Sequence, residues 1–345
     1  MAINGALYRE GLYYGDEYDV RGSSYNASED RITGDVEQAN ISVSGYFRYV
    51  GSGTTGGRFW GGDDTIDVSA RYIYGDAQYS RSNSILYAGD DEITVRENLV
   101  DDYYNVYGDI VSTAATVYGG TDSIVGHRNE DATGYFYGDG GSVHSRGGGY
   151  GGDDSIKATN ADDYIYGDFQ NTNGASRANG GDDSIWGFGG DDYIVGDVVY
   201  GGRGFREAGN DTIYGGSGGD TIYGDIQSDT NSTIGGDDKI NAGKGHDKVW
   251  AGGGDDIVNG GKGHDALFGG AGDDILKGGK GRDSLLGGEG EDILKGGKGN
   301  DRLDGGYEAD TLTGAKGADT FIFNSVDGDH VTDFSQKQGD KIDLS

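Results

Sequence analysis

The feature of this sequence that most limits its fold is a nine-residue repeat, which runs without interruption from residue 242 to residue 322. Nine consecutive nonads fill this stretch, and each has aspartate at its sixth position and an apolar residue at its eighth. Glycine dominates the first, second and fourth positions. Short units that keep one register over many copies predict a solenoid, in which each repeat packs against its neighbours.

Each nonad is interpreted as a glycine-rich turn followed by a strand of three residues. Glycine accepts positive φ angles and allows backbone carbonyl groups to face a shared space. Side chains alternate along a strand, so the apolar eighth residue points inward and its two neighbours point outward. Two nonads make one coil, which places residues eighteen apart on neighbouring strands about 4.8 Å apart.

The sixth-position aspartates are the candidate metal ligands. Carboxylates stacked at the strand spacing repel one another unless a cation lies between them. Oxygen ligands without histidine or cysteine favour calcium over zinc. Nonads two apart should share one ion, which gives about seven sites in the regular stretch. The predicted aspartate ligands are Asp154, Asp163, Asp183, Asp192, Asp211, Asp220, Asp238, Asp247, Asp256, Asp265, Asp274, Asp283, Asp292, Asp301, Asp310 and Asp319. The predicted carbonyl ligands belong to Gly243, Gly245, Gly252, Gly254, Gly261, Gly263, Gly270, Gly272, Gly279, Gly281, Gly288, Gly290, Gly297 and Gly299.

The pattern G-G-x-G-x-D-x-U-x is the established calcium-binding repeat of RTX proteins, and the chain resembles these haemolysin-type calcium-binding proteins. The resemblance covers residues 242–322 cleanly and residues 151–241 with interruptions. It implies an all-β fold, the parallel β-roll or β-solenoid, with several calcium ions between its turns. One nonad departs from the pattern, because Glu308 stands where the fourth glycine before Asp310 belongs.

A longer repeat precedes the regular one. Its first landmark is an aspartate before an apolar strand, at Asp64, Asp91, Asp122, Asp154, Asp183, Asp211 and Asp238. Its second landmark is a Gly-Asp pair just after a strand, at Asp76, Asp109, Asp139, Asp168, Asp197 and Asp225. Asp154 and Asp163 are nine apart, which is the nonad step. The additional residues of each turn enter at one corner, so we predict the same roll with a row of polar loops, such as residues 169–179.

We predict four subregions within one solenoid. Residues 1–60 form a degenerate N-terminal cap, and residues 61–241 form a roll with looped repeats of 27–33 residues. Residues 242–322 form the regular nonapeptide roll, and residues 323–345 form a C-terminal cap or secretion-related segment. This last segment is similar to the ends of serralysin-type proteases and of the repeat modules of mannuronan epimerases. That resemblance implies export by a type I system that reads an uncleaved C-terminal signal.

One outward column is aromatic along most of its length. It contains the ninth-position residues Tyr74, Tyr107, Tyr137, Tyr166, Val195, Tyr223, Trp250, Phe268 and Leu286. One interpretation is a stacked ladder that stabilises parallel strands beneath the loops. The other is a contact surface at the last three residues, where no loop can cover them.

Composition restricts the partners. With 27 basic and 60 acidic residues, the chain has a net charge of −33. Without calcium it should repel itself and bury too little apolar surface to fold, so the energy of calcium binding becomes folding energy. The acidity argues against nucleic acid and anionic membranes as partners. Cysteine is absent, which fits an export route without disulfides. The residues after Met1 contain no apolar run typical of a signal peptide, and no stretch has the length of a membrane span.

Catalytic motifs give no consistent constellation. Gly215–Gly219 matches the G-x-S-x-G elbow of hydrolases, but it lies inside a nonad, without a helix after it. The five histidines form no H-E-x-x-H motif, and His246 and His264 occupy free turn positions where solvation is the simplest interpretation. Irregular residues at the free outward positions disfavour an ice-binding array.

The sequence therefore predicts a secreted, extracellular calcium-binding RTX protein that folds on calcium and is not an enzyme. We expect a structural or interaction role, with self-association or a cell-surface or polysaccharide partner, and with neither nucleic acid nor a membrane span. The alternative is the non-catalytic RTX region of a type I-secreted enzyme, such as a protease, lipase or polysaccharide-modifying enzyme. A β-helical polysaccharide enzyme is a third hypothesis, which needs clustered acid and base residues on the looped face.

Overall fold

The structure is a computed structural model, and every regular element that it describes is a β-strand. The described residues are 7–9, 12–18, 24–26, 31–35, 42–50, 58–60, 62–69, 72–80, 85–95, 103–113, 116–126, 133–143, 148–168, 177–199, 206–227, 233–324 and 328–344. None of these residues belongs to a helix of the length and hydropathy that a bilayer crossing requires.

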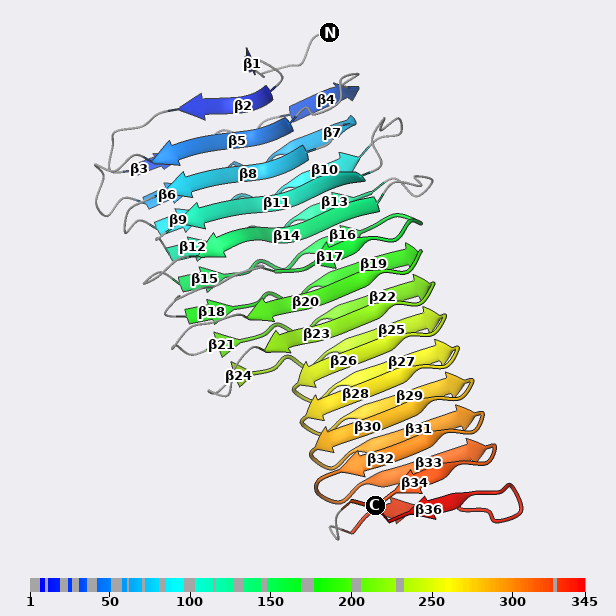
Figure 1. Ribbon diagram of the computed structural model, residues 1–345. Helices are drawn as coiled ribbons and strands as arrows, with labels where there is room; N and C mark the ends of the chain where they lie inside the picture. Colours follow the sequence, from blue (N-terminus) through cyan, green and yellow to red (C-terminus); the bar gives the residue numbers. More distant parts are fainter. Residues whose placement is uncertain are drawn as a thin grey trace. The chain divides into compact units, whose positions relative to one another are not determined.

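Two compact units make up the chain. The first consists of Met1–Ile185, Asp197–Ala208 and Gln227–Thr233. The second consists of Trp186–Gly196, Gly209–Ile226 and Ile234–Ser345. Four boundaries fall within β19 (Ser184–Gly189), β20 (Tyr193–Val199), β23 (Thr221–Gln227) and β24 (Thr233–Ile234), and the fifth lies between Ala208 and Gly209. Each unit is a parallel β-roll, and each is described separately below (Figure 1).

Strands of successive coils in the first unit stack into three sheets. One sheet contains β1 (Leu7–Arg9), β2 (Leu12–Tyr18), β5 (Ser42–Val50), β8 (Tyr72–Ser80), β11 (Tyr103–Thr113), β14 (Thr133–Val143) and β17 (Tyr164–Tyr166). The second contains β4 (Arg31–Asp35), β7 (Thr65–Ser69), β10 (Glu92–Val95), β13 (Ser123–Val125) and β16 (Ser155–Lys157). The third contains β3 (Ser24–Asn26), β6 (Arg58–Trp60), β9 (Ile85–Tyr87), β12 (Thr116–Tyr118), β15 (Gly148–Tyr150), β18 (Arg177–Asn179) and β21 (Arg206–Glu207). The pairing is parallel except between β1 and β2.

The third sheet shows that the corner insertions contain more regular structure than the sequence analysis expected. We expected polar loops, yet the insertion at residues 169–179 ends in strand β18, and equivalent strands occur in the neighbouring coils. Similar insertions stacked at one corner place their backbone N–H and C=O groups opposite one another, and pairing satisfies those groups. Residues 169–176 lie outside the described residues.

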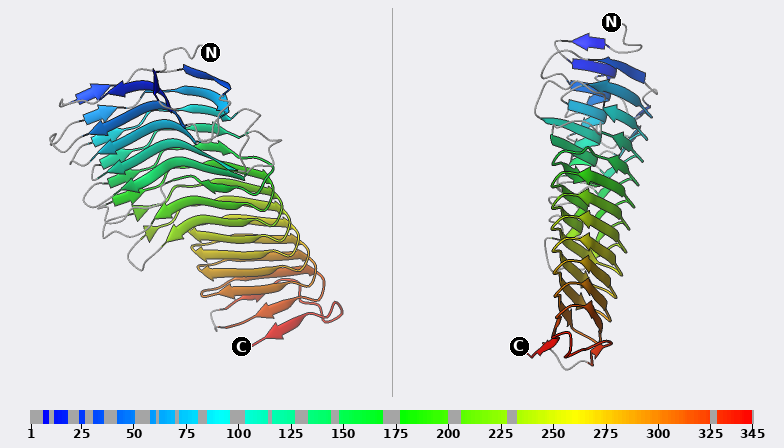
Figure 2. Two further views of the ribbon diagram at one scale, coloured as in Figure 1. Left: turned by 45° about the horizontal axis from the view of Figure 1, so that its top comes forward. Right: turned by 90° about the vertical axis from the view of Figure 1, so that its right-hand side faces the viewer.

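Regular coils of two strands each form the second unit, and their strands alternate between two sheets (Figure 2). One sheet contains β22 (Thr212–Ser217), β25 (Lys239–Lys244), β27 (Ile257–Lys262), β29 (Ile275–Lys280), β31 (Ile293–Lys298), β33 (Thr311–Lys316) and β35 (His330–Val331). The other contains β23, β26 (Lys248–Gly253), β28 (Ala266–Ala271), β30 (Ser284–Glu289), β32 (Arg302–Gly306), β34 (Thr320–Ile322) and β36 (Lys341–Asp343). Val249 pairs with Leu267 and Leu267 with Leu285, which confirms the eighteen-residue register.

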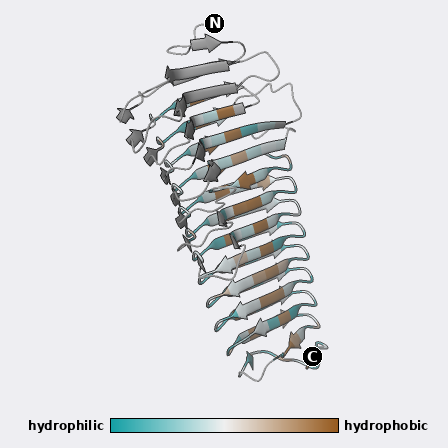
Figure 3. Ribbon diagram, turned by 60° about the vertical axis from the view of Figure 1, so that its left-hand side comes forward, coloured by the Kyte–Doolittle hydropathy of each residue, from teal (hydrophilic) through white to brown (hydrophobic). Residues whose placement is uncertain are grey.

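The core of each unit is a set of single-file apolar columns, visible as brown segments at the centres of the strands in Figure 3. In the second unit the eighth-position residues from Val249 to Phe321 are all at most 1% exposed. In the first unit Ile73, Val106 and Phe136 are completely buried and stand in register on neighbouring strands. Because each coil contributes only one such residue per strand, apolar burial is modest and the turns must add stability.

The predicted aromatic ladder is confirmed within each unit. Rings of Tyr107 and Tyr137 stack with centroids 4.5 Å apart, and Tyr74 and Tyr166 extend this stack in the first unit. In the second unit Trp250 stacks on Tyr223 at 4.8 Å and on Phe268 at 5.3 Å. Val195 of the same column is completely buried, as Tyr137 nearly is.

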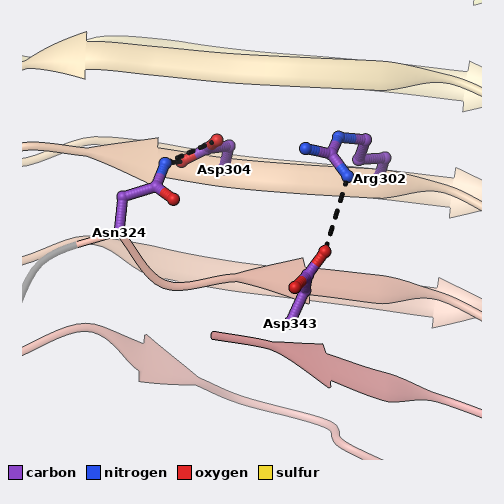
Figure 4. A network of polar contacts seen from close by, with 4 residues as sticks. All are labelled: Arg302, Asp304, Asn324 and Asp343. Carbon is purple, nitrogen blue, oxygen red and sulfur yellow. Dashed lines mark hydrogen bonds and ion pairs between the residues drawn. The ribbon is translucent and has the colours of Figure 1, made fainter. Parts of the chain in front are cut away.

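The C-terminal segment supplies hydrogen-bond acceptors to the last coils of the second unit. Asp329 and Asp340 accept the backbone N–H groups of Asp310 and Asp319, which a further coil would otherwise satisfy. Nearby, Asn324 donates to Asp304, and Arg302 lies 3.9 Å from Asp343 (Figure 4). These contacts cap an otherwise open strand edge. The four predicted subregions stay predictions, and for residues 1–60 the structure describes only strand backbone.

Candidate metal centre

All sixteen predicted aspartate ligands are buried, and none is more than 2% exposed. An aspartate is rarely buried to this extent without a partner. Its position follows from the local fold: the glycine-rich turn folds back, and the sixth residue enters the coil just before the strand begins.

A hydrogen bond between coils fixes each of these carboxylates. Oδ1 of Asp256 accepts the backbone N–H of Asp238 at 2.8 Å, and Oδ1 of Asp274 accepts that of Asp256 at 2.9 Å. The same bond recurs along both edges of the second unit as far as Asp319. Because Oδ1 is held in this way, the direction of Oδ2 is also fixed.

The second carboxylate oxygen has no hydrogen-bond partner among the described residues. This holds for Oδ2 of Asp220, Asp238, Asp247, Asp256, Asp265, Asp274, Asp283, Asp292, Asp301 and Asp310, each fully shielded from solvent. A buried polar oxygen left unpaired costs about 1–3 kcal/mol, and more when it is charged. A ladder of such oxygens therefore requires a cation or protons.

Carbonyl oxygens face the same space. A Cβ on Gly287 would lie 2.0 Å from Oδ2 of Asp292 and 2.5 Å from the carbonyl oxygen of Gly305. The corresponding distances at Gly260 are 2.7 Å to Asp265 and 3.0 Å to Gly278. Glycine at the first position thus leaves a small space lined by carboxylate and carbonyl oxygens. This all-oxygen set fits calcium.

The fourteen glycines with predicted carbonyl ligands all adopt positive φ, between 99° and 151°. They also stack closely, since a Cβ on Gly263 would lie 1.3 Å from the carbonyl oxygen of Gly245. Both facts explain why glycine occupies these positions. The ligand role of their carbonyls stays a prediction. The carbonyl oxygen measured beside each carboxylate belongs to the first position, which the sequence analysis did not include.

Burial raises the pKa of these carboxyl groups. It raises the pKa of Asp256 to about 8 and those of Asp247, Asp274, Asp292 and Asp301 to about 7. Loss of hydration is the largest cause, the backbone N–H bond opposes it, and neighbouring aspartates raise the pKa further. Without a cation, the ladder should therefore hold protons near neutral pH.

Comparison with known families agrees with this geometry. A family model for the RTX calcium-binding nonapeptide repeat matches residues 148–171, 176–198, 207–230, 233–267, 259–294, 268–303 and 286–321. The chain contains RTX calcium-binding repeats. All sixteen predicted aspartate ligands lie within the matched segments. No curated protein matches the chain. The similarity of the C-terminal segment to proteases and epimerases stays a prediction.

The RTX nonad with the irregular turn keeps its geometry. Glu308 has a φ of 71°, so it adopts the left-handed conformation of the glycine that it replaces. Its side chain accepts the backbone N–H of Gly290 at 3.1 Å. Asp310 remains buried, and its Oδ1 still accepts the N–H of Asp292 at 2.9 Å. The departure therefore leaves the carboxylate in place.

Asp163 differs from the other aspartates of the RTX repeats. Its Oδ1 accepts the N–H of Gly134, and its Oδ2 accepts both the N–H and the hydroxyl of Thr159 at 2.8 Å. Its turn contains Thr159 where most of the other repeats have glycine. Both oxygens are thus engaged by the protein, so the structure favours a turn-stabilising role for Asp163.

In the first unit, aspartates gather in threes. The clusters are Asp91–Asp109–Asp122, Asp122–Asp139–Asp154 and Asp154–Asp168–Asp183, and in each the ligand atoms lie within 4.8 Å of one another. The middle member comes from the Gly-Asp pair after a strand. Oδ2 of Asp139 accepts the N–H of Gly152 at 2.7 Å, whereas its Oδ1 is buried and without a partner.

Asp91, Asp109, Asp122, Asp139 and Asp168 are not among the ligands predicted from the sequence. The signal was present, because the Gly-Asp pair recurs once per coil. Recognising this aspartate as a ligand requires knowing which coils are neighbours. The unequal lengths of the repeats conceal which coils are neighbours. Asp91, Asp109, Asp122 and Asp139 also lie outside the matched RTX segments.

The two turn histidines are exposed, as expected, but they also have a structural role. Nδ1 of His246 accepts the N–H of His264 at 2.8 Å, and Nδ1 of His264 accepts that of Arg282 at 2.7 Å. Along the opposite edge Asp255 and Asp273 make the same contact. The fifth position thus links successive coils.

Proposed function

We propose that this chain is a secreted calcium-binding protein whose RTX rolls fold when calcium fills their turns outside the cell. The observation that supports this proposal is the ladder of buried, partnerless Oδ2 atoms, with carbonyl oxygens beside those of Asp265, Asp274, Asp283 and Asp292. Calcium supplies positive charge and accepts several oxygen ligands without strict geometry. The protein's role is then structural or adhesive, and it needs no catalytic residue.

Each site in the second unit would use one sixth-position carboxylate and turn carbonyl groups from two coils. The aspartate hydrogen bond orients the ligand oxygen, and the positive-φ glycines allow close approach of the carbonyls. Because the sites need two coils, the unfolded chain does not contain them. Calcium binding therefore stabilises only the folded roll.

In the first unit the three-aspartate clusters extend the same proposal. They comprise seven carboxylates, and three divalent ions would bring six positive charges. The sites share Asp122 and Asp154, so neighbouring ions would be bridged. A higher number of carboxylates per ion favours tighter calcium binding.

The affinity of the rolls for calcium determines the compartment in which they fold. Extracellular calcium modules bind at about 10⁻⁴–10⁻³ M, so such rolls stay unfolded in a low-calcium cytosol and fold outside. This behaviour suits export of an unfolded chain by a type I system. The alternative proposal, the RTX region of a secreted enzyme, is supported by the resemblance of residues 323–345 to protease and epimerase ends. Coding sequence upstream of Met1 would favour the alternative.

Circular dichroism with and without calcium tests the proposal. We expect a largely unfolded spectrum in a chelator and a β-sheet spectrum in millimolar calcium, with magnesium a poor substitute because it demands smaller, octahedral sites. Equal β-sheet content in the chelator and in calcium would contradict the proposal.

A further inference from the structure

One sheet of the second unit carries lysines on five strands that contain no acidic residue. Strands β25, β27, β29, β31 and β33 contain eight lysines, and neither aspartate nor glutamate occurs in them. Such a face is unexpected in a chain of net charge −33. The strands form the yellow to orange stack in Figure 1.

The third-position lysines form a continuous row. Lys244, Lys262, Lys280, Lys298 and Lys316 pair directly, each with the next along the stack. At the strand spacing they stand about 4.8 Å apart and span roughly 19 Å. Like charges placed directly opposite one another destabilise a sheet. None of these ammonium groups has an ion-pair partner among the described residues.

The row borders a groove of about 730 Å³. Its floor is formed by the second-position residues Gly243, Gly261, Gly279 and Gly297, which have no side chain to fill it. The lysines form one wall, and Asn241, Asn259 and Lys295 form the other. The groove crosses the strands, so it follows the direction in which the coils repeat.

The other sheet of the same unit has the same glycine floor with the opposite charge. Gly270, Gly288 and Gly306 line a groove of about 340 Å³, whose walls include Glu289 and Asp304. The groove itself is thus a consequence of the nonad. The lysines are a separate feature of one side, which points to a ligand rather than to folding.

We propose that the lysine groove binds a linear anionic polysaccharide. A polyuronate chain carries one anionic group per ring on a thin backbone, so it can lie along the glycine floor and meet one ammonium group per coil. Exposed Ile257 and Ile293, on two of the same strands, offer apolar surface to the C–H faces of sugar rings. The proposal rests on calcium-dependent folding of this unit.

Other polyanions fit less well. Single-stranded nucleic acid is bound by proteins that stack bases on aromatic side chains, and no aromatic residue lines this groove. Duplex DNA carries one charge per about 1.7 Å, much denser than the lysine row. An extended acidic peptide repeats its side chains on one face every ~7 Å, which does not match the coils.

Fluorescence anisotropy in millimolar calcium tests the proposal. The probes are labelled heparin-derived oligosaccharide, which carries sulfates as well as carboxylates, and short labelled oligogalacturonate, which carries carboxylates alone. Neutral dextran and oligothymidylate are the comparison ligands. We expect binding of at least one anionic sugar, weakening with salt because exposed charges are screened, and no binding of dextran.

Two matched variants locate the site. Lys280→Gln with Lys298→Gln removes two charges from the row and should weaken binding roughly tenfold. Lys248→Gln with Lys341→Gln removes the same charge from the other sheet and should change affinity less than about twofold. All four lysines are exposed, so circular dichroism in calcium should match the parent.

Three results would overturn the inference. They are an absence of binding to both anionic sugars, an equal loss in the two variants, and tighter binding of oligothymidylate than of sugar. Each leaves the proposed function standing if calcium still folds the chain. If the chain does not fold in calcium, that result contradicts the proposed function instead.

Discussion

At the scale of single residues, the sixth-position aspartate combines two roles that are normally separate. One oxygen connects coils through a backbone N–H, and the other is directed at the space left by the first glycine. Asparagine would preserve the first role and remove the charge that the second requires. The ladder can therefore be examined one carboxylate at a time.

Asp274→Asn should lower stability in saturating calcium by about 2–3 kcal/mol, because one ion loses its carboxylate ligand. In a chelator above pH 8, where the Asp274 carboxyl group is charged without a cation, the same change should leave the β-content unchanged or raise it. Thermal unfolding in calcium and circular dichroism in the chelator measure the two effects. Asp273→Asn is the control, because Asp273 is exposed and keeps an acceptor for Glu291. A clear loss of β-content in the chelator would contradict a metal role.

The raised carboxyl pKa values predict a pH dependence. Folding raises the pKa of these aspartates from 3.8 to between about 6 and 8. A raised pKa in the folded state contributes stability below the unfolded value and loses it as pH rises through the folded value. The calcium-free chain should thus show most β-structure near pH 4 and least above pH 8. Circular dichroism in a chelator tests this, and greater β-content at pH 8 would contradict it.

Calcium displaces the same protons, so calcium affinity should rise between about pH 6 and pH 8. Each bound ion should release protons near pH 6.5. Isothermal titration calorimetry in buffers of different ionisation enthalpy measures this release. An affinity that is constant over this range would mean that the ladder is already ionised without calcium.

At the scale of the elements, the turn is more constrained than the strand. The glycines at the second and fourth positions both have positive φ, but they differ in how much room a side chain would have. A Cβ at the second position of a coil, Gly279, would lie 2.3 Å from the nearest carbonyl oxygen, and one at the fourth position, Gly281, would lie 1.3 Å away. Ala315 occupies a second position with φ of 71°, so an alanine can be accommodated there.

Gly281→Ala should therefore destabilise the roll by about 3 kcal/mol or more. Gly279→Ala, two residues away, should cost about 1 kcal/mol. Urea unfolding in saturating calcium provides the comparison. Equal effects would show that close stacking at the fourth position does not matter.

Much of this architecture could be predicted from the sequence because the nonad is local. The eighth-position core, the sixth-position burial and the eighteen-residue register all follow from one short pattern. What the pattern did not reveal depends on pairing between coils. The third sheet, the position-five contacts of His246 and Asp255, and the capping role of Asp329 arise only when unequal segments stand beside one another.

At the scale of the whole molecule, the two units would hold calcium differently. The second unit offers one carboxylate with a partnerless oxygen per nonad, whereas the first unit gathers three carboxylates in a cluster. More carboxylates per ion favour tighter binding, so the first unit should fill before the second as calcium rises.

Terbium, which replaces calcium, should report the three-aspartate clusters of the first unit through the tyrosines beside them. Tyr137 precedes Asp139 by two residues, roughly 7 Å along the strand. Asp139→Asn should reduce tyrosine-sensitised emission by at least about a third, because at least one of three clusters is lost. Asp153→Asn is exposed, changes the same charge and should leave emission unaffected. Similar emission from both variants would contradict the three-aspartate sites.

The sharing of Asp122 and Asp154 between clusters has a consequence for how the protein would respond to its surroundings. When one ion leaves, the aspartate that it shared contacts only the neighbouring ion. The carboxylates of the empty site then repel one another and those of the adjacent site. Loss of one calcium ion would then promote loss of the next ion along the row. The outcome is an abrupt threshold for this row of the first unit, whose three sites would be either all loaded or all empty, with few partly filled forms between.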